Sequence, residues 1–143
     1  MSPANHTFGE FRVGQEIALG CRGPITTEMM ARWAAGSGDF NPIHYDTAEA
    51  LRQGLPGVII AGPMKFAMLL DCLTDWAGGQ AYVKQAHTRY QGMDTPGTVF
   101  TFTAKVTDLT PHAATGAVTL DVTVTDQEGK VNTTGSATLE LPL

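Results

Sequence analysis

The chain has 143 residues, a formal net charge of −5, a pI near 5.2 and 43% hydrophobic residues. This length is enough for one domain with a real core, and we expect a single domain over residues 1–143. The acidic balance disfavours nucleic acid, whose binders usually carry a basic stripe, because the nine Lys and Arg residues are spread singly along the chain.

Neither export nor membrane insertion is expected. The N-terminal segment MSPANHTFGEF lacks the basic stretch and apolar run of a secretion signal. The most apolar segment, residues 58–70, is interrupted by Gly62, Pro63 and Lys65 and is too short to span a bilayer. We therefore expect a cytoplasmic protein that does not contact membranes.

The first half of the chain carries mainly helical signals. Residues 11–21 predict an opening strand, after which Thr26 or Thr27 can cap a short helix that ends near Gly38. A turn-rich loop follows, and Thr47 can then cap a second short helix, TAEALRQ. The sequence thus predicts two short helices joined by a loop.

Residues 63–77 predict the longest helix of the chain. Pro63 suits the first helical turn, where its missing N–H is no loss, and Gly78-Gly79 close the far end. Its apolar residues fill an arc of roughly 200°, wider than the stripe of a surface helix. We expect this helix to be buried, with the aromatic residues Trp33, Phe66 and Trp76 in the core rather than lining a ligand tunnel.

After residue 80 the apolar residues alternate with polar ones, which indicates strands with one buried face, as in antiparallel sheets. A hairpin turn is expected at residues 127–130. The predicted fold class is α+β, a five-stranded antiparallel sheet wrapped around the long helix. Such a sheet leaves edges exposed, so we expect a partner chain. The four strands are predicted at residues 81–92, 98–109, 118–126 and 136–143.

The loop SGDFNPIHYD, residues 37–46, concentrates titratable side chains. One interpretation is structural: Asp39 and Asn41 form turns, His44 is a satisfied core histidine, and Asp46 caps the next helix. On residue types alone, this interpretation and a chemical one stand about even.

A metal site is the weaker chemical interpretation. His44 and Asp46 have the spacing of facial-triad iron ligands, which need a second histidine such as His87 or His112. A three-residue pattern of this kind occurs often by chance. We expect neither a metal nor a cofactor.

Acid/base chemistry uses more of the loop. Asp39 and His44 are five positions apart, and a loop of that reach can turn both side chains toward one water, a proton-transfer pair near neutral pH. Asn41 can orient one member of the pair. Gly62, directly before the long helix, offers a backbone N–H at a helix N-terminus as an oxyanion donor.

SGDFNPIHYD and the GLPGVIIAGPM segment together resemble the MaoC-like (R)-specific enoyl-CoA hydratases and 3-hydroxyacyl-thioester dehydratases. The resemblance covers nearly the whole chain and implies a hot-dog domain that assembles as a dimer. It also implies that Asp39 and His44 form the catalytic pair, that Asn41 supports it, and that Gly62 supplies the oxyanion N–H. Ala61 stands where the family usually has a histidine, and Leu70 stands near a position that is polar in some members.

The implied reaction is reversible syn addition of water to a trans-2-enoyl thioester of coenzyme A or acyl-carrier protein. Lys65, Lys84 and Arg89 could contact the phosphates of coenzyme A, although solvated side chains are the commoner explanation. Two rival functions stay open: a hot-dog thioesterase, and a non-catalytic or half-active subunit that shapes the tunnel of another hot-dog chain. We expect a homodimer or higher oligomer, with a heterodimer of two hot-dog chains as the alternative.

Overall fold

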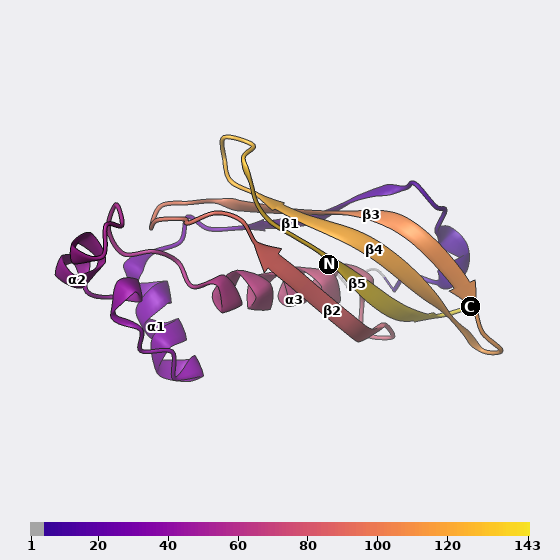
Figure 1. Cartoon of the computed structure of the whole chain (residues 1–143). Coiled ribbons are helices and arrows are strands. Elements are labelled where there is room, and N and C mark those ends of the chain that lie inside the picture. Colours follow the sequence, from indigo (N-terminus) through magenta and orange to yellow (C-terminus); the bar gives the residue numbers. More distant parts are fainter. Residues whose placement is uncertain (1–4) are drawn as a thin grey trace.

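The computed structural model describes residues 5–143. Five antiparallel strands form one sheet in the order β1-β3-β4-β5-β2, and the long helix α3 runs along one face of it (Figure 1). This is the hot-dog fold that the resemblance implied. The elements are η1 (Phe8–Glu10), β1 (Glu16–Arg22), α1 (Thr27–Ser37), η2 (Pro42–His44), α2 (Thr47–Arg52), α3 (Gly62–Ala77), β2 (Tyr82–Tyr90), β3 (Phe100–Pro111), β4 (Thr115–Thr125) and β5 (Val131–Pro142).

The core lies between α3 and the concave face of the sheet. Strand alternation predicted this face correctly, because the inward residues of β3 and β4 are buried while most of their neighbours reach solvent. The buried inward residues of these two strands are Phe100, Phe102, Ala104, Val106, Val118, Leu120, Val122 and Val124.

Helix α3 is buried along one face that is narrower than its wide apolar arc predicted, because Phe66, Met68 and Leu70 are only partly buried. Leu69, Cys72 and Leu73 are inaccessible to solvent, and burial raises the pKa of the Cys72 thiol. Trp33, Phe66 and Trp76 are partly buried and pack against the core cluster.

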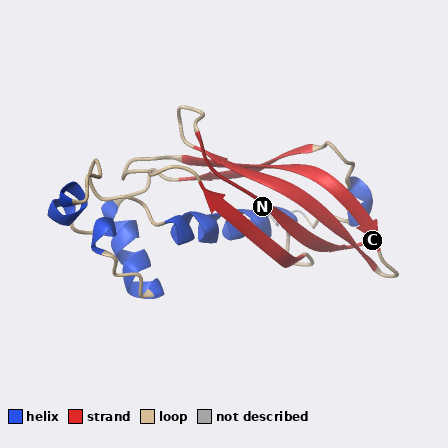
Figure 2. Ribbon diagram, in the orientation of Figure 1, coloured by secondary structure: helices blue, strands red, loops and turns tan. Residues whose placement is uncertain are grey.

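Helices α1 and α2 lie beyond one end of the sheet, joined by the loop that carries the titratable residues (Figures 1 and 2). Thr26 caps α1 through its side chain, which accepts a hydrogen bond from Met29 N–H, and Gly38 ends this helix in the left-handed conformation with φ of 75°. Asp46, not Thr47, caps α2, because its carboxylate accepts the Glu49 N–H at 3.1 Å.

Element boundaries differ most from the expectation at the starts of β1 and β5. β1 begins at Glu16 instead of residue 11, because Gly14 turns the chain at φ of 89°. β5 begins at Val131 instead of residue 136, because Asn132 and Thr133 are buried in spite of their polarity. The turn after β4 is as predicted: the Asp126 carboxylate accepts the N–H groups of Glu128 and Lys130.

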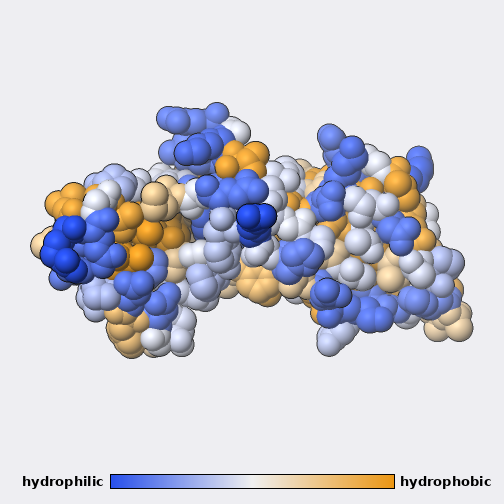
Figure 3. Space-filling view, viewed as in Figure 1, coloured by the Kyte–Doolittle hydropathy of each residue, from blue (hydrophilic) through white to orange (hydrophobic). Residues whose placement is uncertain are grey.

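Apolar surface gathers at the end of the molecule that carries α1 and α2 (Figure 3). Three side chains there remain largely exposed: Phe40 at 60%, Tyr45 at 53% and Leu51 at 56%. Within residues 5–143, no helix is long and apolar enough to cross a membrane. The first four residues of the N-terminal segment considered above lie outside the described residues.

Candidate active site

The structure brings Asp39 and His44 together. Oδ2 of Asp39 lies 3.7 Å from Nε2 of His44, and the two side chains are 34% and 13% exposed. The pair is therefore partly sheltered but open to water on one side. A separation of this size leaves room for one water that contacts both groups, since each hydrogen bond needs about 2.8 Å.

Local hydrogen bonds fix the loop that presents Asp39. Ser37 donates to the Trp33 carbonyl at 2.7 Å, and its hydroxyl accepts the Asp39 N–H at 3.2 Å. The Asn41 N–H then donates to Oδ1 of Asp39 at 3.3 Å. One carboxylate oxygen is therefore held within the loop, and the other is left to face His44.

Asn41 contacts the turn before His44 through its side chain. Its side-chain oxygen accepts the Ile43 N–H at 3.4 Å and caps the short helix η2, in which Pro42 occupies the first turn. The side chain thus shapes the turn that carries His44 rather than contacting the imidazole.

The second nitrogen of His44 is held by the main chain. Nδ1 lies 2.7 Å from the carbonyl oxygen of Ile59. A carbonyl can only accept, so Nδ1 carries the hydrogen in this contact. In the neutral imidazole the lone pair is then on Nε2, the nitrogen that faces Asp39.

Residues 59–62, named here the bridging segment, connect this loop to the start of α3. The Ile59 N–H also donates to the Ile43 carbonyl at 3.0 Å, so both polar groups of Ile59 bind the loop of residues 37–46. Sequence reasoning missed this link, because a main-chain carbonyl leaves no signal in residue types. Three residues after Ile59, Gly62 begins α3.

Gly62 combines a free N–H with close packing. Its N–H has no acceptor within residues 5–143, whereas those of Met64 and Lys65 bond to the Ala61 carbonyl. A Cβ at position 62 would lie 2.5 Å from the ring of Tyr90, so a larger residue would require this ring or the helix start to shift. The N-terminus of α3 thus places one backbone donor, which has no acceptor among the described residues, next to an aromatic ring.

Lys65 is not at the surface, in contrast to the expectation that it contacts phosphate. Its side chain is 1% exposed, and Nζ pairs with Oδ2 of Asp94 at 2.7 Å and with the Gly92 carbonyl at 3.2 Å. A buried ammonium that already has an anionic partner is not available to a phosphate in solvent. Lys65 is therefore not among the proposed substrate contacts.

The other two cations lie on β2 and are exposed. Lys84 pairs with Glu140 at 3.0 Å and keeps 49% of its side chain accessible. Arg89 borders a hollow on the outer face of the sheet together with His87 and Thr123. Within one chain the sheet therefore separates Arg89 from α3, and its expected contact with substrate stays a prediction.

The metal interpretation finds no support. Within residues 5–143, no group of three or more His, Cys, Asp or Glu side chains could hold a metal ion. Asp46 caps α2, and His87 contacts Ser136 on the sheet. His87 lies on β2, apart from the loop that carries His44 and Asp46.

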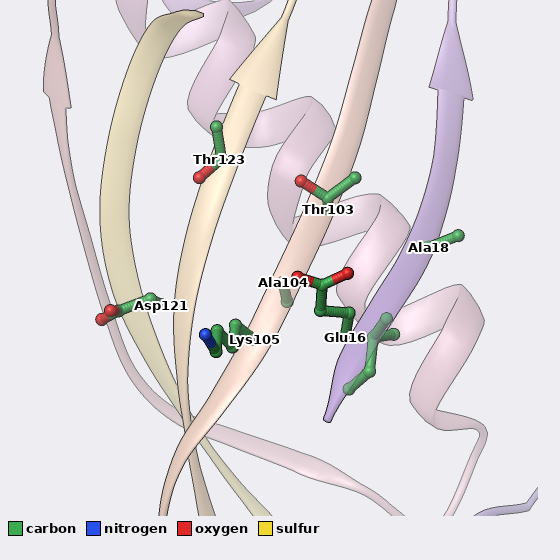
Figure 4. Close-up of a pocket in the computed structure, with 8 residues that line it drawn as sticks. Glu16, Ala18, Thr103, Ala104, Lys105, Asp121 and Thr123 are labelled. Atoms are coloured by element: carbon green, nitrogen blue, oxygen red, sulfur yellow. The ribbon is translucent and has the colours of Figure 1, made fainter. Parts of the chain in front are cut away.

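A hollow of about 650 Å³ lies elsewhere, over β1, β3 and β4 (Figure 4). Figure 4 shows Glu16, Lys105 and Asp121 on the outer face of these strands, with α3 behind the sheet. The lining of this hollow contains none of the candidate catalytic residues. This open, solvated face is not the candidate active site.

The family comparison agrees with the geometry. The family model of the MaoC like domain matches residues 10–128, which include the Asp39–His44 loop and the start of α3. The chain belongs to the MaoC-like dehydratase family. No curated protein matches this MaoC-like chain.

Solved structures share the fold of this MaoC-like chain. The (R)-hydratase from A. caviae involved in PHA biosynthesis is 25% identical, has a TM-score of 0.81, and is matched over 92% of this chain and 98% of that one. R-hydratase PhaJ1 from Pseudomonas aeruginosa is 24% identical with a TM-score of 0.85, over 96% and 86%. The ChsH1-ChsH2 complex from Mycobacterium tuberculosis is 21% identical with a TM-score of 0.76, over 91% and 98%.

Proposed function

We propose that this MaoC-like chain is a hydro-lyase that adds water reversibly, with syn geometry, to trans-2-enoyl thioesters and dehydrates (R)-3-hydroxyacyl thioesters. The observation that carries the proposal is the Asp39–His44 pair, whose Oδ2 and Nε2 atoms are 3.7 Å apart, with Nδ1 of His44 held by the Ile59 carbonyl. The similarity to the A. caviae (R)-hydratase supports the same reaction class.

The protonation pattern of the pair orients a nucleophilic water. An ionised Asp39 can only accept hydrogen bonds, and the neutral His44 also accepts at Nε2, because its hydrogen is on Nδ1. A water between them must donate both of its hydrogens. Its oxygen lone pairs then point away from the pair, toward the space in which a substrate carbon would lie.

Addition follows from this arrangement. The water oxygen bonds to C3 of the enoyl thioester while the pair accepts one proton from the water, and the electrons of the C2–C3 double bond move toward the thioester carbonyl. The pair then returns one proton to C2, so the enzyme ends as it began. Because both atoms arrive from the face occupied by Asp39 and His44, the addition is syn. Each proton transfer is written for the pair as a whole.

Gly62 supplies the complementary electrostatics. Charge develops on the thioester oxygen as the enolate forms, and the free N–H at the N-terminus of α3 donates to that oxygen. Ala61 replaces the histidine usual in the family without removing this donor, because the donor is a backbone group.

The carrier of the acyl group is coenzyme A or acyl-carrier protein, and Lys84 and Arg89 remain the proposed phosphate contacts. Both side chains lie on β2, the last strand at one edge of the sheet. Across a dimer, cations of one chain can reach the site of the other, which a single chain does not permit for Arg89.

We propose a homodimer, with a heterodimer of two hot-dog chains as the alternative. The free edge of β2 presents unpaired backbone groups. Phe40 and Tyr45, in the loop that carries Asp39 and His44, are more than half exposed. The ChsH1-ChsH2 complex is a two-chain member of this fold. Light scattering on the purified chain should give twice its 15.2 kDa; a monomer that dimerises only with a second hot-dog chain favours the alternative.

The reaction class is tested by product analysis in heavy water. The purified chain is incubated with trans-2-butenoyl-CoA, and the product is examined by NMR and chiral chromatography. We expect (R)-3-hydroxybutanoyl-CoA with one deuterium at C2, placed syn to the new hydroxyl. Release of free thiol without hydration would identify a thioesterase and overturn the proposal.

A further inference from the structure

We propose that the buried cluster of Lys65, Asp94 and Asn132 is a positioning network for the catalytic site. This inference rests on the hydratase function proposed above. None of the three side chains is placed to touch the substrate, so their role is to hold the bridging segment, and through it Gly62 and His44, in the reactive arrangement.

Asp94 is the centre of the network. Its Oδ2 accepts from Lys65 Nζ at 2.7 Å, and its Oδ1 accepts from the Asn132 amide at 3.0 Å. The amide orientation follows from chemistry, since a carboxylate can only accept. Lys65 and Asn132 are 1% and 0% exposed, and the side chain of Asp94 is 7% exposed.

The main chain of Asp94 holds the bridging segment from the side opposite to the catalytic loop. The Ile60 N–H donates to the Asp94 carbonyl at 2.7 Å, while the adjacent Ile59 uses both of its polar groups on the loop. Successive residues of an extended chain direct their polar groups to opposite sides. The bridging segment therefore lies between His44 and Asp94 and is hydrogen-bonded on both sides.

The network also ties this assembly to the sheet and to α3. The Asn132 carbonyl, on β5, accepts the Gln91 and Gly92 N–H groups at 2.8 and 3.2 Å. Lys65, in the first turns of α3, lies with its ammonium 5.7 Å from the centre of the Tyr90 ring, which covers Gly62. A displacement of any member would move the start of α3 relative to His44.

Stability alone does not explain these charges. Replacing a buried ion pair by neutral residues of similar volume is often neutral or stabilising, because burial removes both ions from water. A cation near a helix N-terminus is also on the unfavourable side of the helix dipole. The ion pair instead fixes the position of the bridging segment, and neutral residues in its place would hold that segment less firmly.

The test replaces the pair by neutral residues of similar shape, Lys65→Met with Asp94→Asn, and keeps Asn132. Steady-state kinetics with trans-2-butenoyl-CoA are combined with NMR hydrogen exchange of the Ile60 amide and of the core Val122 amide. The control is Arg22→Met, which removes an ion pair between β1 and Asp71 of the same helix at the surface.

We expect the double variant to fold and to lose about 10- to 100-fold in kcat with little change in KM, since small misplacements at a site cost rates of this order. Ile60 protection should fall at least about tenfold, with Val122 unchanged. The proposal would be overturned if the double variant kept both the kcat and the Ile60 protection of the wild type. It would also be overturned if kcat fell without a change in Ile60 protection, or if Val122 lost as much protection as Ile60. Without any turnover in the wild type, the Ile60 amide still decides the positioning claim, and only the hydratase function fails.

Discussion

The carbonyl oxygen of Ile59 lies 2.7 Å from Nδ1 of His44, so the main chain that leads into α3 fixes the imidazole. This contact joins the two halves of the site: the loop after α1 that carries Asp39 and His44, and the helix start that carries Gly62. It also leaves Nε2 as the nitrogen of His44 that faces Asp39.

The first prediction concerns that tautomer. In long-range 1H–15N spectra of the neutral His44 ring, the hydrogen should be found on Nδ1, because the Ile59 carbonyl can only accept. The His44→Gln variant assigns the signal. A ring with its hydrogen on Nε2 would contradict the proposed orientation of the water.

The second prediction concerns Gly62. Gly62→Ala should lower kcat by about tenfold or more, because the new Cβ would lie 2.5 Å from the Tyr90 ring and displace the helix start. In a Tyr90→Ala background the same substitution should cost much less. A double-mutant cycle on kcat measures the difference, and purely additive effects would refute the steric cause.

Sequence patterns predicted the sheet, the long helix and the proximity of Asp39 and His44 because each has a local signal. Alternation defined β3 and β4, and the Pro63 and Gly78 positions bounded α3 to within one residue. Asp39 and His44 are close in the chain, so their proximity could be anticipated. The bulk of the fold therefore followed from periodicity and caps.

Long-range contacts between polar groups could not be predicted in this way. Lys65 and Asp94 are 29 positions apart, and Lys65 was expected at the surface because isolated lysines usually lie there. Asn132 gave β5 a polar start that obscured its strand pattern. The strand order of the sheet and the Ile59 carbonyl likewise depend on tertiary pairing.

The third prediction concerns stability. Lys65→Met alone leaves the Asp94 charge buried without its partner and should lower the free energy of unfolding by about 3–5 kcal/mol. The double variant Lys65→Met, Asp94→Asn should recover most of that loss. Urea unfolding of the three proteins measures both changes, and a single variant as stable as wild type would show that the pair contributes nothing.

The fourth prediction concerns acid. Hydrogen bonds from Arg52 and then Gln53 lower the pKa of Glu49 on α2 from 4.5 to about 2. Because the folded pKa lies below the unfolded one, the contribution of this group to stability is present above about pH 4.5 and is lost as the pH falls toward 2. NMR titration of Glu49 should show the low pKa, and Arg52→Gln should raise it. An ordinary pKa in the wild type would contradict the structure.

The most direct test of the central claim compares wild type and Asp39→Asn in hydration of trans-2-enoyl-CoA substrates, followed by loss of the conjugated thioester absorbance. Asp46→Asn, which changes only the cap of α2, is the control from the same loop. We predict turnover by the wild type and the control, and a loss of about 100-fold or more in Asp39→Asn. Hydration by Asp39→Asn at the wild-type rate would contradict the assignment of the Asp39–His44 pair as the catalytic centre.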